Sequence, residues 1–134
     1  TDKVKEQNRN PRKIYTLDNG LKQLVSIKTD FGRRLENIVF LHLRRMYKDI
    51  YYYKGKQEID FCYLDATNQL QLVNVAFHVH EASTYNREIK SLWEGMHYFN
   101  LAQGTLITHE HEDIMKDGNK VVEIIPLWKW LLSG

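Results

Sequence analysis

Three strand-like segments follow one another between two amphipathic helical segments, and this order limits the folds that the chain can adopt. Residues 49–54, 58–64 and 70–79 are rich in Tyr, Ile, Val and Phe, and Gly55 separates the first two segments. Aromatic and β-branched residues favour strands, and a glycine between two such runs favours a hairpin. Three successive strands followed by a helix predict a sheet that the chain builds locally and then covers.

Helical periodicity marks the segments on either side of these strands. A helix is expected over residues 31–46, with Asp30 as its N-cap. Its expected buried stripe comprises Leu35, Ile38, Val39, Leu43 and Met46. A second helix is expected to begin at Ser83 or Thr84. Its expected buried stripe comprises Tyr85, Ile89, Leu92, Trp93, Met96 and Phe99.

Strands are expected again at residues 105–108 and 121–125. Residues 109–119 between them are expected to form a polar excursion, with a turn at 117–119. Pro126 suits the first turn of a closing helix over residues 127–132. The order αβββαβ predicts an α/β fold with a mixed central sheet and helices on both faces.

The length of 134 residues predicts one domain, over residues 14–134. The polar residues 1–13 are expected to be a linker or the end of a preceding domain. Residues 14–17 alternate like a short strand before a turn at 18–20. The chain begins at Thr1 rather than Met, so we expect it to be a piece of a longer protein.

Composition excludes some classes of protein. No apolar run approaches the roughly 20 residues that a membrane span needs, and no signal-peptide pattern opens the chain. The single cysteine, Cys62, excludes an internal disulfide and suits a reducing compartment, so we expect a cytoplasmic protein. A net charge of +2 does not by itself indicate nucleic-acid binding.

The strand residues 58–60 and 72–77 suggest part of a metal-dependent nuclease site. Hydrolysis of a phosphodiester with Mg²⁺ needs carboxylates on adjacent strand ends and a lysine two residues beyond the second carboxylate. Asp60 could be the first carboxylate, and Glu36 on the preceding helix could reach the same site, whereas Asn74 and Ala76 stand where the second carboxylate and the lysine belong. Such a site is expected to bind Mg²⁺ weakly. The alternative for Asp60 is a solvated residue or an ion-pair partner of Lys54 or Lys56.

Other side chains suggest weaker sites. His78 and His80 share a strand face and could bind a metal with Asp60; the alternative, which the absence of further ligands favours, is an ordinary strand end with half-exposed histidines. His109 and His111 form a second such pair in a polar stretch. The arginines of the first helix could contact phosphate or an acidic partner, against the alternative of a solvated helix face.

Four separate segments, in order, resemble a known family. They are residues 34–45 (RLENIVFLHLRR), 50–54 (IYYYK), 55–61 (GKQEIDF) and 124–132 (IIPLWKWLL). Together they resemble the uncharacterised C-terminal domain of bacterial and archaeal P-loop ATPases of the AAA type. The resemblance places that domain in the PD-(D/E)XK, or restriction-endonuclease-like, nuclease superfamily. It covers residues 13–132 and implies a restriction-endonuclease-like αβββαβ core and an ATPase domain in the same chain.

The resemblance also implies roles for individual residues. Glu36 matches the family's helix glutamate and Asp60 its strand aspartate, while Asn74 and Ala76 fall on the positions of the second carboxylate and the lost lysine. The leading hypothesis is a non-catalytic nuclease-fold domain that serves an ATPase as an accessory or interaction module. The alternatives are a Mg²⁺-dependent DNA endonuclease with a non-standard active site, in which His78 could replace the lysine, and a DNA-binding module without cleavage.

Overall fold

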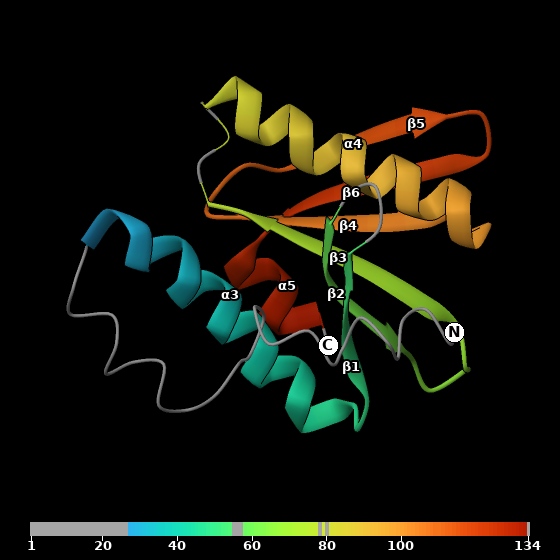
Figure 1. Cartoon of the computed structure of the whole chain (residues 1–134), viewed down its shortest axis with the longest axis horizontal. Coiled ribbons are helices and arrows are strands. Elements are labelled where there is room, and N and C mark those ends of the chain that lie inside the picture. Colours follow the sequence, from blue (N-terminus) through green and yellow to red (C-terminus); the bar gives the residue numbers. More distant parts are fainter. Residues whose placement is uncertain (1–26, 55–57, 78, 80, 134) are drawn as a thin grey trace.

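The computed structural model describes residues 27–54, 58–77, 79 and 81–133, with side chains from residue 35 onward. Within these residues a mixed six-stranded sheet carries helices on both faces (Figure 1). The predicted α/β class is therefore confirmed. The predicted linker 1–13, the strand 14–17 and the turn 18–20 lie outside the described residues.

The elements follow the predicted order and then continue it. They are α3 (Ile27–Met46), β1 (Ile50–Lys54), β2 (Glu58–Leu64), β3 (Leu70–Ala76), α4 (Ala82–Phe99), β4 (Gln103–Thr108), β5 (Asp113–Asp117), β6 (Lys120–Pro126) and α5 (Leu127–Ser133). The spatial order of the strands is β1-β2-β3-β4-β6-β5. The first three pair antiparallel, whereas β3 and β4 pair in parallel because α4 carries the chain back across the sheet.

Two apolar clusters lie on opposite faces of the sheet. Leu92 and Met96 of α4 pack with one of them, and Val39 and Leu43 of α3 belong to the other, to which α5 adds Leu127 and Trp130. Alternation along β3 places Leu72 and Ala76 on the α4 side, and Val73 and Val75 on the α3 side. None of the described helices is long and apolar enough to cross a membrane.

Helix α3 differs from the prediction at its start and along one edge of its stripe. It begins at Ile27, so Asp30 lies inside the helix and does not cap it. Aspartate costs a helix interior less than about 1 kcal/mol, so one cap-like residue does not determine where a helix begins. Leu35, Val39 and Leu43 are buried, but Ile38 and Met46 are exposed because the sheet covers only a narrow stripe.

Helix α4 also begins earlier than predicted. Its N-cap is Glu81, which makes no side-chain capping bond, and Ser83 and Thr84 lie in the first turn. The predicted apolar stripe is confirmed, with Ile89, Leu92 and Met96 buried and the other predicted members partly buried against the same cluster.

The polar stretch 109–119 contains a strand that the sequence pattern does not predict. β5 pairs antiparallel with β6 at the sheet edge, and the chain turns between Asp117 and Lys120 with Gly118 at φ 62°. All its side chains except that of Met115 are exposed, so it has no apolar alternation to detect. Pro126 ends β6 and directly precedes α5.

Asp65 organises the turn that joins β2 to β3. One carboxylate oxygen accepts hydrogen bonds from the Thr67 N–H (2.9 Å), the Thr67 hydroxyl (2.6 Å) and the Gln69 N–H (3.0 Å). The other oxygen accepts one from the Gln71 amide (2.8 Å). Because these bonds favour the ionised form, led by the Thr67 hydroxyl and the Gln69 N–H, they lower the pKa of Asp65 to about 2.

Replacing Asp65 should change how stability depends on pH. A carboxyl whose pKa is lowered by folding stabilises the folded state fully above its unfolded value of 3.8, and this contribution is lost as the pH falls toward about 2. We expect Asp65→Ala to lower stability at pH 7 and to flatten the acid limb between about pH 4 and 2. Urea denaturation across this range measures it. The control is Asp117→Ala in the exposed edge strand, which should change stability at pH 7 by no more than about 0.5 kcal/mol. A curve for Asp65→Ala that only runs parallel to that of the wild type would contradict this role.

Candidate functional site

The two central residues of the predicted site are neighbours in the structure. In the antiparallel pair β2–β3, Phe61 lies opposite Val73, which places Asp60 and Asn74 next to each other at the end of the ladder. Both are buried, Asp60 with 7% of its surface exposed and Asn74 with none. The interpretation of Asp60 as a solvated strand residue is therefore wrong.

An irregularity in β2 explains how Asp60 comes to face this position. β1 pairs Tyr51 with Cys62 and Tyr53 with Ile59, so Tyr52 alone lies opposite both Asp60 and Phe61. Two residues opposite one are the mark of a β-bulge, which locally interrupts the ladder and redirects side chains. Backbone groups at the bulge consequently need partners other than the adjacent strand.

Side chains accept hydrogen bonds from two backbone N–H groups here, one in the bulge and one on the neighbouring strand β3. The Asp60 N–H donates to Asn74 Oδ1 at 2.8 Å, and the Val75 N–H donates to Asp60 Oδ2 at 3.0 Å. Asn74 Nδ2 then donates to the Glu88 carbonyl of α4 at 3.3 Å. We call this set of bonds the Asp60–Asn74 clasp. It joins β2, β3 and α4, and it engages both polar atoms of the Asn74 amide.

Ala76, at which the resemblance implies a lost lysine, is part of the core. Ala76 lies on the same strand face as Asn74, has only 3% of its surface exposed and belongs to the apolar cluster under α4. A neutral methyl group there can neither stabilise the charge of a scissile phosphate nor orient water.

Glu36 lies on a helix and not on the sheet. It is half-buried on α3, the helix whose stripe packs on the face opposite α4. The structure thus joins Asp60 to Asn74 through the clasp, whereas Glu36 comes from the other layer. Among the described residues no group of three or more His, Cys, Asp and Glu side chains is arranged to hold a metal ion.

The predicted histidine pairs have different outcomes. His78 and His80 lie outside the described residues. The His109 ring stacks on Phe77 with centroids 4.8 Å apart, while His111 meets the edge of Tyr85 at 5.8 Å. These two imidazoles therefore pack against separate aromatic rings.

A cavity of about 390 Å³ opens beside Asp60, between β2 and α4. We call it the acidic cavity; it is lined by Glu58, Asp60, Arg87, Glu88 and Ser91. Arg87 Nε lies 3.7 Å from Glu88 Oε1, but its side chain is 65% exposed, so this pair neutralises the cavity only weakly. The α4 residues were not predicted, although Glu88 and Ser91 at i and i+3 share a helix face.

Cys62, two residues after Asp60, is not a reactive thiol. It is fully buried, and burial followed by the negative charge of Asp60 raises the pKa of its thiol. It therefore stays protonated at neutral pH, and the thiolate that reacts or binds metals does not form.

These features define a mixed α/β domain in which a buried Asp–Asn pair closes the end of a strand ladder beneath a helix. The chain belongs to the family described as "Domain of unknown function (DUF4143)", whose model matches residues 31–130. Uncharacterized protein MJ1544 of Methanocaldococcus jannaschii is 32% identical over 132 residues, which cover 90% of this chain and 29% of that protein. The chain thus spans less than a third of the length of this relative. No solved structure matches the chain significantly.

Proposed function

We propose that this domain is a non-catalytic, nuclease-fold accessory module through which a larger P-loop ATPase contacts a partner. The Asp60–Asn74 clasp carries the proposal. Its bonds use the first carboxylate and the second ligand position of a nuclease site to replace backbone pairing. A pair bound in this way serves the fold, and with Ala76 in the lysine position the site lacks the group that assists hydrolysis.

The nuclease-fold part of the proposal is supported by topology and spacing. The αβββαβ order, the mixed sheet and the position of Asp60 beside Asn74 all agree with the arrangement that the resemblance implies. The ATPase part is supported by the sequence resemblance, and it accords with a relative more than three times as long as the matched segment.

Cleavage assays test the proposal directly. Linear, single-stranded and branched DNA are incubated with Mg²⁺ or Mn²⁺ and the wild-type chain, with Asp60→Asn alongside. Asparagine can still accept from the Val75 N–H, so this variant removes the charge while keeping that bond. We expect both proteins to leave all substrates intact. Metal-dependent cleavage by the wild type that disappears in Asp60→Asn would refute the non-catalytic assignment.

One observation favours a second candidate, a Mg²⁺-dependent endonuclease with a non-standard site. Glu58, Asp60 and Glu88 line the acidic cavity, and carboxylate oxygens suit Mg²⁺, although the three side chains are not arranged as a metal site among the described residues. If the assay above shows cleavage, Glu88→Gln should abolish it along with Asp60→Asn.

A DNA-binding role without cleavage would instead use the exposed Arg44 and Arg45 of α3. A gel-shift assay would identify it if the chain still retards DNA at about 150 mM salt, where the Debye length is about 8 Å and exposed charges are largely screened.

A further inference from the structure

A second cavity, of about 410 Å³, follows the acidic cavity along α4. We call it the aromatic cavity; its lining comprises Tyr53, Ile59, Ser91, Trp93, Glu94, Gly95, His97 and Tyr98. Ser91 lines both cavities. The α4 residues 87, 88, 91, 94, 95 and 98 repeat at helical spacing, so the two cavities lie end to end along about 16 Å of α4, beside β1 and β2, and together we call them the groove.

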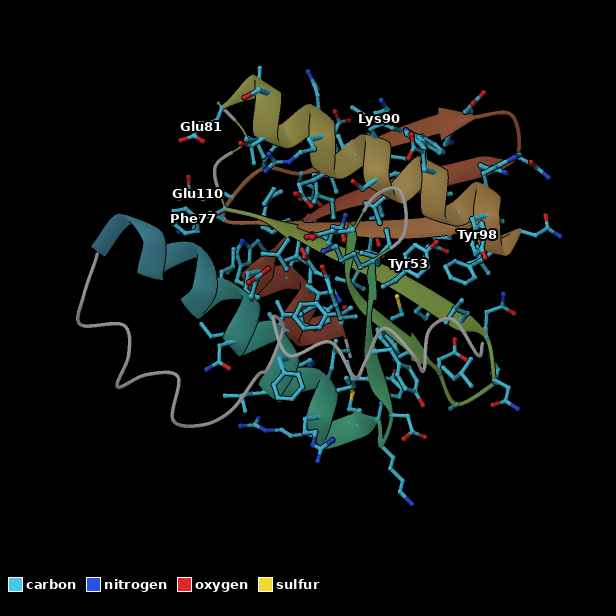
Figure 2. All side chains as sticks on the ribbon, viewed as in Figure 1. Tyr53, Phe77, Glu81, Lys90, Tyr98 and Glu110 are labelled. Carbon is cyan, nitrogen blue, oxygen red and sulfur yellow. The ribbon has the colours of Figure 1, made fainter. Side chains whose placement is uncertain are left out.

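Aromatic side chains form much of the second cavity. Tyr53 of β1 and Tyr98 of α4 lie close together beside the C-terminal half of α4 (Figure 2), with ring centroids 5.8 Å apart. Gly95 lets the helix approach the sheet here, because a Cβ atom at this position would lie only 3.0 Å from Ile59 Cδ1. Tyr98 keeps 47% of its surface exposed, so the cavity opens to solvent beside this ring.

Glu94 is the unusual member of this lining. Its Oε2 atom is buried from solvent and has no hydrogen-bond partner among the described residues. A buried carboxylate oxygen without a partner is costly, so such atoms normally accept a hydrogen bond. The cavity therefore combines an apolar, aromatic wall with a hydrogen-bond acceptor that has no donor within the described part of the chain.

The charges along the groove favour a cation. Glu94 lies in the aromatic cavity, and Glu58, Asp60 and Glu88 line the acidic cavity. Among the described residues that line the two cavities, Arg87 is the one lysine or arginine, and its side chain is largely exposed to solvent. A groove of this sign repels phosphate and attracts a positively charged group.

We propose that this groove binds an arginine side chain of a partner polypeptide. The guanidinium would donate to the Glu94 carboxylate and stack against the tyrosine rings, while apolar neighbours of the arginine would cover the aromatic wall. Arginine fits better than lysine because its planar guanidinium donates in a fork to carboxylates and stacks on aromatic faces. This inference rests on the proposed interaction function and names the partner chemistry of that function.

Isothermal titration with short synthetic peptides tests the proposal. The probe is the pentapeptide Ac-Ala-Leu-Arg-Leu-Ala-NH₂, and its matched control carries citrulline, the neutral isostere, in place of arginine. We expect the arginine peptide to bind at least about tenfold more tightly, since a charge-assisted bond is roughly twice as strong as a neutral one and a factor of ten is 1.4 kcal/mol. In ¹H–¹⁵N spectra the peptide should shift the amide signals of residues 91–98.

Glu94→Gln identifies the receiving group. We expect it to weaken the arginine peptide by about tenfold and to leave the citrulline peptide unchanged. Glu81→Gln is the charge-matched control, because Glu81 is exposed at the opposite end of α4 (Figure 2) and makes no capping bond; it should bind like the wild type. Thermal unfolding of both variants establishes that they remain folded.

Three results would overturn the proposal. They are no binding of the arginine peptide at millimolar concentration, equal binding of the citrulline peptide, and equally tight binding of N-acetyl-arginine amide, which would make a small cation the ligand. The cleavage assay does not involve Glu94. If the chain binds the arginine peptide and also cleaves DNA, the non-catalytic assignment fails and the groove proposal stands. If it neither binds the peptide nor cleaves DNA, the groove proposal fails and the non-catalytic assignment stands.

Discussion

Asn74→Asp should destabilise the domain by about 3 kcal/mol or more at pH 7, since it leaves a buried charge without compensation. Asn74 is fully buried, accepts from the Asp60 N–H and donates to the Glu88 carbonyl. An ionised aspartate cannot donate, so the Glu88 bond is lost and two carboxylates come together at the strand end. The variant places a carboxylate where the proposed nuclease fold would have its second one, at the expense of stability.

Urea denaturation at several pH values measures this effect. The penalty should shrink as the pH falls toward 4, because a protonated carboxyl is neutral and can again donate to the Glu88 carbonyl. Asn86→Asp is the matched control, since Asn86 is exposed in the first half of α4, and it should change stability by no more than about 0.5 kcal/mol. If Asn74→Asp unfolds at the wild-type urea concentration at pH 7, the clasp has no structural role and the proposed function loses its main support.

Phe61→Ala should cost about 3–5 kcal/mol, the range for removing a fully buried aromatic side chain. Phe61 has no exposed surface and lies in the cluster that holds α3 against the sheet, together with Val39, Leu43 and Val73. It also follows Asp60 in the bulge, so it anchors the strand segment that presents the carboxylate. Truncation removes apolar contact and leaves a cavity that the rigid sheet cannot close.

The measurement is again the free energy of unfolding in urea, with the slope of the transition compared to detect a change in the unfolded state. Trp128→Ala provides the control, because Trp128 is equally large and aromatic but 60% exposed on α5; it should cost less than about 1 kcal/mol. Equal effects of the two substitutions would contradict the assignment of Phe61 to the core.

Much of the secondary structure follows from local pattern. Leu35, Val39 and Leu43 recur every four residues and predict the buried stripe of α3, and Tyr52 is the buried member of its tyrosine run, as alternation requires. β5 could not be predicted in this way, because an edge strand with four exposed side chains out of five leaves no apolar period. Helix starts were also missed, since capping preferences are weak beside tertiary packing.

The sequence by itself determined the α/β class, the order of the first elements and the positions of Asp60, Asn74 and Ala76, because periodicity and spacing are local properties. Only the tertiary structure decided what these residues do: the bulge in β2 turned Asp60 and Asn74 into hydrogen-bond partners of backbone groups. It likewise placed Glu94 beside Tyr53, 41 positions earlier, in one cavity. Such contacts depend on how α4 crosses the sheet, and the packing of whole elements sets that crossing.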